Sequence, residues 1–467
     1  MKLDVPAVCD DSRSVTEGSL FAVMPKAEAY IDQAIEQGAT VIMIDRVFED
    51  VYVPQYPEIC WVMTDDPRRT FHSLAARFYG DPSKKIRTVG VTGTNGKTTI
   101  TYLIESIFHA AERATAVIGT IDRHIGKKSF STKNTTPGFL ENQEFFADLL
   151  KEGVDHAVME VSSHALAQGR VDEIDIATAI FTNLSGDHLD YHGDMEGYFA
   201  AKSLMFLGLS DQANAVINYD DVYGQRLFQR TEAKIITYGL APEADVRAEI
   251  KASDLKGMHL EIFYPEGSCE LFTPMIGKHN VYNILAAFAC GLVEGISVPL
   301  IVKGLQLLAH VPGRLERVIN DRNLDIFIDY AHTDDGLKNV LESLKKIEHN
   351  SLIVVFGCGG DRDRTKRSRM GRVAEELSDM AIVTSDNPRS EEPMDIIREI
   401  EGGMGQKNYE VYPDRQDAII RAINIATPGD IVLLAGKGHE TYQILKDETI
   451  DLDERVIVAE ALKKRAK

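Results

Sequence analysis

The sequence predicts an α/β protein with three domains in tandem, at residues 1–85, 86–312 and 313–467. The first reason is size. The chain has 467 residues, more than one hydrophobic core usually organises, and 44% of them are hydrophobic, which is enough for several cores. The second reason is order. Strand-like apolar runs alternate with helical patterns, as in parallel sheets that carry helices on their faces.

The first domain is predicted to be a small α/β unit. Residues 31–37 have the pattern of a helix, and three apolar runs predict strands at residues 20–23, 39–44 and 59–63. Residues 79–83, Tyr-Gly-Asp-Pro-Ser, are turn formers, so we expect this unit to end there.

The second domain opens on a glycine-rich loop. Residues 86–89 have extended character, residues 90–99 read Gly-Val-Thr-Gly-Thr-Asn-Gly-Lys-Thr-Thr, and residues 100–108 have helical periodicity. Val311-Pro312-Gly313 predicts a linker at the end of this domain. Later apolar runs predict further strands of a largely parallel sheet, at residues 156–161, 178–183, 213–218, 234–238 and 259–263.

The order of strand, glycine loop and helix is the one that cradles phosphate groups. Glycines let backbone N–H groups approach an anion, Lys97 would reach the terminal phosphates, and Thr98 would offer a hydroxyl to Mg²⁺. Position 91 is valine, so the spacing differs from the common GxxxxGK[ST] pattern. The ordered context still favours nucleotide binding over a plain surface turn, and it predicts a P-loop ATPase-type domain that binds ATP. The predicted ATP contacts in the loop are Gly93, Thr94, Asn95, Gly96, Lys97, Thr98 and Thr99.

The third domain repeats the alternation of strands and helices. The residues Gly357-Cys358-Gly359-Gly360 follow its second predicted strand. Its predicted strands are residues 324–328, 352–356, 380–384 and 431–435. This order predicts a Rossmann-like domain.

Composition and charge argue against several classes of function. Lysine and arginine number 51 against 72 aspartate and glutamate residues, a net charge of −21, which argues against a nucleic-acid surface. Five scattered cysteines without a CxxC pair suit a reducing cytosol and argue against structural zinc. No apolar run approaches the length of a membrane span, and the N-terminus has no apolar leader. We therefore expect a cytoplasmic protein without a signal peptide.

Two polar motifs follow predicted strands downstream of the glycine loop. Glu160 lies at the end of one strand, and His188 lies just beyond the next. Ligands gather at such strand ends in doubly wound sheets, so the pair favours Mg²⁺ coordination over two isolated turn residues. Lys202 lies on a helical pattern with apolar neighbours, and periodicity alone would make it a solvated helix lysine.

Seven motifs together have a family likeness. They lie at residues 93–98, 160–163, 182–190, 201–202, 312–314, 329–332 and 436–440. In order and spacing they resemble the ATP-dependent Mur ligases of peptidoglycan assembly, over nearly the whole chain. The resemblance implies an enzyme that forms an amide through an acyl phosphate made from ATP, with Mg²⁺. It also implies a role in cell-wall biogenesis, and so in cell shape and division.

Two further motifs resemble one member of that family. Asp11-Ser12-Arg13 and Asp386-Asn387-Pro388-Arg389 are similar to the ligase that adds the third residue of the stem peptide. The resemblance implies UDP-N-acetylmuramoyl-L-alanyl-D-glutamate as substrate, and the Asp-Asn-Pro-Arg form implies meso-diaminopimelate rather than L-lysine. The chemistry fits, because a guanidinium at Arg389 can bind bidentately the second carboxylate, which L-lysine lacks.

Carried over residue by residue, the resemblance implies a site in several parts. The catalytic residues would be Lys97, His188 and Lys202. The metal ligands would be Thr98, Glu160, His188 and Lys202, the last as a carbamate formed with CO₂. The nucleotide would also contact Asn280, Asn283, Arg314 and Asp329. The muramoyl dipeptide would contact Ser12, Asn134, Thr135, Thr136, Ser162 and Arg170. Diaminopimelate would contact Arg362, Asp386, Asn387, Pro388, Arg389, Gly436 and Glu440.

The sequence departs from the family pattern at two places. Residues 20–26 lead directly into residues 27–32, without the longer glycine-containing stretch that usually helps to hold uridine. Asp334-Asp335-Gly336 stands where the family has Pro-Asp-Ala, and we interpret this difference as neutral loop drift.

Three alternatives remain open at this point. The same ligase could use L-lysine, which a panel of amines would separate. A P-loop kinase or simple ATPase would release phosphate without any amine. A non-catalytic binding module could keep the fold, although intact Lys97, Glu160 and Lys202 argue against it. We expect small-molecule substrates, no nucleic-acid or membrane partner, and a monomer.

Overall fold

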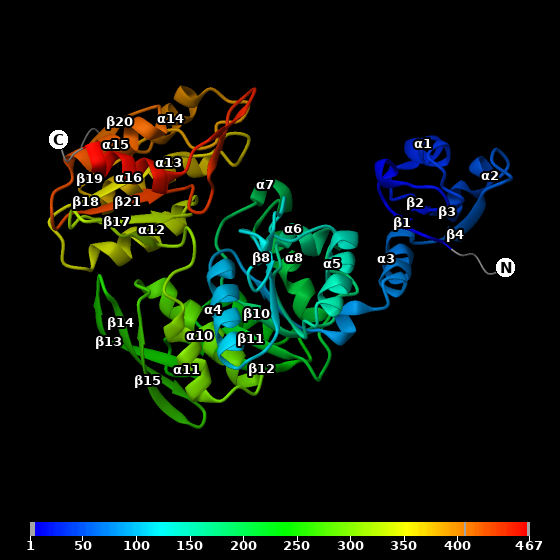
Figure 1. Cartoon of the computed structure of the whole chain (residues 1–467), viewed down its shortest axis with the longest axis horizontal. Helices are drawn as coiled ribbons and strands as arrows, with labels where there is room; N and C mark the ends of the chain where they lie inside the picture. The colour runs from blue at the N-terminus through cyan, green and yellow to red at the C-terminus, as the bar shows by residue number, and fades with distance from the viewer. Residues whose placement is uncertain (1–4, 406–407, 465–467) are drawn as a thin grey trace.

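The computed structural model describes residues 5–405 and 408–464. The chain folds into three sheet-based units that follow one another in sequence (Figure 1). The central unit lies between the N-terminal unit, drawn in blue, and the C-terminal unit, drawn in yellow to red.

The N-terminal unit has one parallel sheet with the strand order β1-β2-β3-β4. Successive side chains of a strand point to opposite faces, so Ile42 packs with Ile31 on one face while Met43 packs with Phe71 on the other. The strands are β1 (Val8–Cys9), β2 (Leu20–Ala22), β3 (Val41–Asp45) and β4 (Cys60–Thr64), and the helices are α1 (Ile31–Glu36), α2 (Glu49–Tyr52) and α3 (Pro67–Phe78).

The central unit is built on an eleven-stranded sheet with the order β15-β14-β13-β12-β11-β10-β5-β9-β6-β7-β8. Seven neighbouring strands are parallel: β5 (Arg87–Thr92), β6 (Thr115–Ile118), β9 (His156–Glu160), β10 (Ile176–Phe181), β11 (Asn214–Asn218), β12 (Lys234–Gly239) and β13 (Val246–Asp254). The edge strands pair antiparallel: β14 (Gly257–Tyr264) and β15 (Gly267–Thr273) on one side, β7 (Arg123–Ile125) and β8 (Lys128–Phe130) on the other. The expected parallel sheet is therefore present in the middle, between two antiparallel edges.

Helices cover both faces of the central sheet. One face packs against α4 (Lys97–Ala110), α10 (Lys278–Val293) and α11 (Val298–Leu307). The other face packs against α5 (Phe139–Lys151) and α8 (Met195–Leu207). Three short helices follow strand ends, namely α6 (Ser163–Ala167), α7 (Leu189–His192) and α9 (Val222–Leu227).

The C-terminal unit has a six-stranded sheet with the order β16-β17-β21-β18-β19-β20, in which only β16 is antiparallel to its neighbour. The helices α12 (Asp334–Lys345), α13 (Thr365–Leu377) and α14 (Pro393–Glu401) cover one face, and α15 (Arg415–Ile425) and α16 (Glu454–Lys464) cover the other. The strands are β16 (Glu316–Val318), β17 (Asp325–Asp329), β18 (Leu352–Phe356), β19 (Met380–Val383), β20 (Tyr409–Val411) and β21 (Ile431–Ala435); β22 (Tyr442–Ile444) and β23 (Thr449–Asp451) form a separate hairpin. This doubly wound arrangement confirms the Rossmann-like expectation.

The strands that sequence reasoning missed are mostly short or polar, and several lie at the edges of sheets. β8 is exposed along its length, and β13 is mostly polar and exposed after its first residues. Neither has the apolar pattern that marks a buried strand. None of the helices among residues 5–405 and 408–464 has the length and apolarity needed to cross a bilayer.

Candidate active site

The glycine-rich loop joins β5 to α4 in the middle of the central sheet. Gly93 and Gly96 have φ values of 144° and 92°, which side chains other than glycine rarely adopt. A Cβ at Gly93 would also overlap the Thr182 hydroxyl. The Lys97 Nζ donates to the carbonyls of Gly93 and Thr94 at 2.9 Å each. Burial lowers the pKa of Lys97, so this ammonium depends on nearby negative charge.

A cleft of about 420 Å³ lies beside this loop, between the central and C-terminal units. The predicted nucleotide residues outside the loop all line it. Asn283 donates to Asn280 Oδ1 at 3.0 Å on α10, and Asp329 at the end of β17 accepts backbone N–H groups from Leu315 and Ala331. Burial raises the pKa of Asp329. The predicted residues that line the cleft are Asn95, Gly96, Thr99, Asn280, Asn283, Arg314 and Asp329.

Two side chains of the C-terminal unit reach the glycine loop directly. Arg314 donates from Nη2 to Thr98 Oγ1 at 2.9 Å. Asp335 accepts from Asn95 Nδ2 and from Ser185 Oγ, each at 3.0 Å. The central and C-terminal units therefore each form a wall of the cleft, and the two walls are in direct hydrogen-bond contact.

Glu160 ends β9 with a buried and oriented carboxylate. Its Oε1 accepts from the Thr120 backbone N–H at 2.8 Å, and its Oε2 accepts from the Thr120 hydroxyl at 3.0 Å. A Cβ at Gly119 would overlap Oε1, so the loop passes very close to the carboxylate. Each carboxylate oxygen keeps further lone pairs for a cation.

His124, on β7, stabilises the loop of residues 119–122, which contacts the Glu160 carboxylate. Its Nδ1 lies 2.8 Å from Asp122 Oδ1, and its Nε2 lies 2.8 Å from Glu105 Oε1 of α4. The Asp122 carbonyl in turn accepts from the Gly119 N–H at 3.0 Å. Burial lowers the pKa of His124, but the two carboxylates raise it by more, to about 9.

We expect His124→Gln to destabilise the protein, and to do so more at about pH 6 than at about pH 10. Because the pKa of His124 is higher in the folded protein than in the unfolded chain, the charged ring stabilises the fold. Its full contribution to the free energy of unfolding is present below the ordinary histidine pKa of 6.5, and it is lost as the pH rises through about 9. Thermal unfolding of both proteins across this range measures the effect. An equal loss of stability at every pH would show that the charged His124 ring does not stabilise the fold through Asp122 and Glu105.

His188 lies before α7 with a left-handed φ of 55°. Its Nε2 is 3.3 Å from Asp187 Oδ2, and its ring meets the His164 ring edge-on at 4.8 Å. Burial lowers the pKa of His188 to about 4, so the ring is neutral and able to ligate at neutral pH. Within residues 5–405 and 408–464, however, no three His, Cys, Asp or Glu side chains gather as a metal site. A magnesium site here would use Thr98 as well.

Lys202 is buried, contrary to the solvated position that periodicity alone predicts. Only 1% of the residue is exposed, because α8 packs against the sheet. Its Nζ donates to the Gly93 carbonyl at 2.8 Å and lies 4.6 Å from the centre of the Tyr198 ring. Burial, and then the nearby Lys97, lower the pKa of Lys202 well below its ordinary value. The side chain is therefore a candidate for a neutral amine beside the glycine loop.

Five of the six predicted dipeptide residues lie close to Glu160. The buried Thr136 donates to the Glu160 carbonyl at 2.8 Å and accepts from the Ser162 N–H at 3.0 Å. Arg170 donates to the Thr136 carbonyl at 3.0 Å. Thr135 shares a 3.0 Å hydrogen bond with Thr120, and Asn134 is exposed one residue before it.

Ser12, the sixth, lies in the N-terminal unit and donates to Gln33 Oε1 at 2.9 Å. The N-terminal and central units meet at His72. Its Nδ1 lies 2.9 Å from Asp172 Oδ2, and its ring stacks on the Phe139 ring with the ring centres 3.8 Å apart.

A cluster of polar side chains, called the polar pocket below, lies where β18, β19 and β21 end. Asn387 donates to Glu440 Oε2 at 2.9 Å, and its Oδ1 accepts from the buried Lys437 at 2.9 Å. Lys437 also donates to Glu440 at 2.7 Å. A Cβ at Gly436, whose φ is 116°, would come within 2.6 Å of Asp386 Oδ2. The predicted amine residues therefore do come together, around a lysine that sequence reasoning missed.

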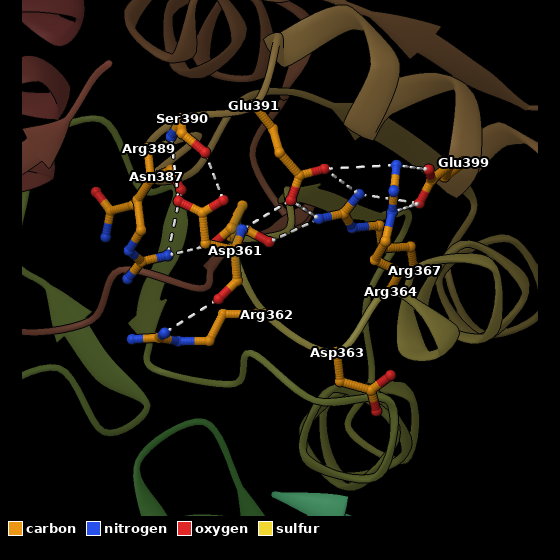
Figure 2. Close-up of polar contacts among 12 residues, drawn as sticks. Asp361, Arg362, Asp363, Arg364, Arg367, Asn387, Arg389, Ser390, Glu391 and Glu399 are labelled. Carbon is orange, nitrogen blue, oxygen red and sulfur yellow. Dashed lines mark hydrogen bonds and ion pairs between the residues drawn. The ribbon is translucent and has the colours of Figure 1, made fainter. Parts of the chain in front are cut away.

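Two arginines complete this pocket from different loops (Figure 2). Arg389 donates to the Gly360 carbonyl at 2.8 Å, and Arg362 donates to the Asp361 carbonyl at 3.1 Å. In the described part of the chain, neither guanidinium forms an ion pair with a carboxylate. Burial, and then the neighbouring Arg362, lower the pKa of Arg389, while the nearby carboxylates of Asp386, Glu440 and Asp361 oppose this shift.

The polar pocket is joined to the nucleotide cleft through Gly313 and Arg314. A Cβ at Gly313 would overlap the backbone of Gly438 and His439, so the two segments are in direct contact. Arg314, the next residue, reaches Thr98 and stacks on Tyr330 at 4.6 Å. Two consecutive residues thus link the glycine loop to the turn that carries Glu440.

Comparison with known proteins identifies the family. Residues 91–291 match the Mur ligase middle domain, and residues 313–438 match the Mur ligase, glutamate ligase domain. UDP-N-acetylmuramoyl-L-alanyl-D-glutamate–2,6-diaminopimelate ligase of Solibacter usitatus is 43% identical, over 98% of this chain and 94% of that protein. The ligase of the same name from Geobacillus thermodenitrificans is 44% identical, over 99% and 96%.

The chain belongs to the Mur ligase family.

Solved structures of Mur ligases share the whole fold. A UDP-N-acetylmuramoyl-L-alanyl-D-glutamate–2,6-diaminopimelate ligase superimposes with a TM-score of 0.73 and 32% identity, over 99% of this chain and 96% of that one. MurF ligase from Thermotoga maritima in complex with ADP superimposes with a TM-score of 0.66 and 18% identity, over 98% and 97%, which shows the fold alone.

In this Mur ligase the structure places at the site two further residues, Lys437 and Asp335, that the sequence motifs did not predict. Lys437 was inside a motif that was recognised, but nothing local marked it as buried. Asp335 lies in the segment interpreted as loop drift, where Asp334 also pairs with Arg369 at 2.9 Å. Both aspartates lie in the first turn of α12, where negative charge stabilises a helix. Only the folded chain brings Asp335 to the glycine loop.

Proposed function

We propose that this Mur ligase joins meso-diaminopimelate to UDP-N-acetylmuramoyl-L-alanyl-D-glutamate, at the expense of ATP, in peptidoglycan precursor synthesis. The observation that carries the proposal is a direct link between two parts of the chain: Arg314 bonds to the glycine loop while Gly313 packs against the turn that carries Glu440. This link would keep a phosphate-binding loop and an amine pocket near each other, as an amide-forming ligase requires. The relatives named above carry this activity in their names.

Each unit would then have its own task. Residues 1–85 would form the UDP-sugar domain, residues 86–312 the ATP domain, and residues 313–467 the amino-acid domain. The enzyme would work as a cytoplasmic monomer on small molecules, without nucleic acid or membrane.

The first step would make an acyl phosphate. The D-glutamate γ-carboxylate attacks the γ-phosphorus of ATP, a new O–P bond forms, and ADP leaves with the electrons of the bond that breaks. Lys97 lies on the loop where this charge develops, and an ammonium in a buried site stabilises such charge strongly. Thr136, Ser162 and Arg170 would hold the dipeptide beside Glu160.

The second step would form the amide. The neutral amine of diaminopimelate attacks the acyl carbon, a tetrahedral intermediate forms, and phosphate leaves while the amine loses a proton. Glu440 and Asn387 would hold the distal ammonium and its neighbours, and Arg389 would bind the distal carboxylate. This arrangement orients the attacking amine toward the cleft.

Mg²⁺ fits the donors beside the loop. The ion prefers oxygen ligands, and the Glu160 carboxylate and the Thr98 hydroxyl supply them. When bound, it would neutralise charge on the transferring phosphoryl group. Lys202 fits a carbamate, because its amine lies buried beside Gly93 and burial lowers its pKa, which favours the neutral form that reacts with CO₂. The amine would attack CO₂, form a C–N bond and release a proton, which leaves a negative oxygen group able to ligate a second Mg²⁺.

Phosphate release from ATP tests the proposal. The assay contains UDP-N-acetylmuramoyl-L-alanyl-D-glutamate with meso-diaminopimelate, with L-lysine or with no amine. Release that needs both the nucleotide sugar and meso-diaminopimelate would support it. Release with L-lysine would overturn the choice of amine, and release with ATP alone would indicate a simple ATPase.

We expect Arg389→Lys to raise the KM for meso-diaminopimelate about 30-fold, since a single ammonium cannot replace a bidentate guanidinium and about 2 kcal/mol of binding is lost. The KM values for ATP and the nucleotide sugar should stay unchanged. Arg398→Lys is a matched control, because Arg398 is exposed on α14 and pairs only locally with Asp395. An unchanged KM for meso-diaminopimelate would remove Arg389 from the amine pocket.

A further inference from the structure

The two pocket arginines have no common element to fix their spacing. Arg362 is on the loop after β18, and Arg389 is on the loop after β19, a parallel neighbour in the sheet. Their side chains converge around Gly359, where a Cβ would lie 3.0 Å from Arg389 Nη1 and 3.9 Å from Arg362 Cγ. Like charges repel at this range, so something must hold the loops together.

A buried arginine behind the loops provides that connection. The Arg367 side chain on α13 is fully buried and meets the Glu391 carboxylate as a fork, with Nη2–Oε1 at 2.8 Å and Nη1–Oε2 at 2.9 Å. Nη2 also donates to the Gly359 carbonyl at 3.2 Å. Arg367 therefore bonds to both loops at once. The hydrogen bond from Arg367 is the largest of the interactions that lower the pKa of Glu391, to about 2.

Glu391 and Asp361 continue the connection toward the pocket (Figure 2). Glu391 Oε1 accepts from the Asp361 backbone N–H at 2.7 Å. The Asp361 carboxylate accepts from the Ser390 hydroxyl at 2.6 Å and from its N–H at 3.2 Å. These bonds fix the residues directly next to Arg362 and Arg389. They also hold Arg389 in its left-handed conformation, with φ at 51°, which a side-chain-bearing residue adopts only under constraint.

We infer that Arg367 and Glu391 are positioning residues for amine selection: they set the spacing of Arg362 and Arg389, so that two guanidiniums accept the distal carboxylate of the amine substrate. Figure 2 shows the guanidiniums of Arg389 and Arg362 on the left, with the carboxylate of Glu391 and the side chain of Arg367 to the right of them. The inference rests on the proposed function. It adds that Arg367 and Glu391, which lie outside the pocket, also determine which amine the enzyme prefers.

The test uses Glu391→Gln and Arg367→Lys in the full chain. We expect the KM for meso-diaminopimelate to rise about tenfold, and the preference for it over L-lysine to fall about as much, because small misplacements of binding groups carry large costs. The kcat and the KM values for ATP and the nucleotide sugar should change less than about twofold.

Glu399→Gln is the matched control. Glu399 accepts from Arg367 Nη1 at 2.9 Å, so its loss removes the same kind of charge from the same guanidinium while both loop bonds remain. It should lower thermal stability and leave the amine KM unchanged. If Glu391→Gln does not fold, Asp361→Ala at an exposed position cuts the bonds to Ser390 and should raise the amine KM by about threefold.

Two results would overturn the inference. One is a loss of stability in Glu391→Gln with an unchanged KM for meso-diaminopimelate. The other is an equal loss of kcat/KM for every amine. Failure of the proposed function is distinct, because it would show in the unmodified protein as phosphate release that does not depend on meso-diaminopimelate.

Discussion

Replacing Lys97 by alanine should lower kcat for phosphate release by about a thousandfold or more, or about 4 kcal/mol of transition-state stabilisation. The side chain is buried at the start of α4, and its ammonium is held by two carbonyls of the glycine loop. The charge that develops on the transferring phosphoryl group would lose its nearest fixed cation.

The measurement is steady-state phosphate release with all substrates present, together with a thermal melt to show that the variant folds. Lys151→Ala is a suitable control, because Lys151 is exposed and pairs only with Asp148. If Lys97→Ala kept more than about a tenth of the wild-type kcat, the loop would not be acting on the transferred group.

Replacing Lys202 by alanine should lower kcat by about a hundredfold to a thousandfold, if its carbamate ligates a second Mg²⁺. The structure supports this because the amine is buried, which lowers its pKa, and lies 2.8 Å from the carbonyl of Gly93 in the phosphate loop. A lysine that served only as packing would affect stability more than kcat.

A direct readout exists besides activity. Protein equilibrated with ¹³C-labelled bicarbonate should show a carbamate carbon signal that Lys202→Ala lacks. Activity of the wild-type enzyme should fall in CO₂-depleted buffer and return when bicarbonate is added. The same signal in both proteins, or a variant with nearly full kcat, would contradict carbamylation at this position.

Much of the fold follows from local sequence. The buried strands β3, β9, β18 and β21 are continuous apolar runs, and the helix after the glycine loop has clear periodicity. Burial of such runs on both faces leaves little freedom in how they are placed. Edge strands such as β8 were missed because exposed, polar residues leave no pattern to read.

The candidate site divides in the same way. The glycine loop and Glu160 were predicted from chemistry that lies within a few consecutive residues, whereas the Asp386–Arg389 turn was assigned to the site by the family resemblance. Periodicity alone would place Lys202 in solvent, since it says nothing about what packs over the side chain, and only the family resemblance assigned Lys202 to the site. Its partner Gly93 is 109 residues away in the chain.

The sequence by itself determined the three α/β units and the phosphate loop, because each is encoded in short segments whose geometry is local. Tertiary structure decided which charges are buried and what they hold: Lys202 beside the loop, Lys437 between Asn387 and Glu440, and Arg367 behind the two pocket arginines. The physical reason is that desolvation and ion pairing depend on groups brought together from distant parts of the chain, which only the packed fold specifies.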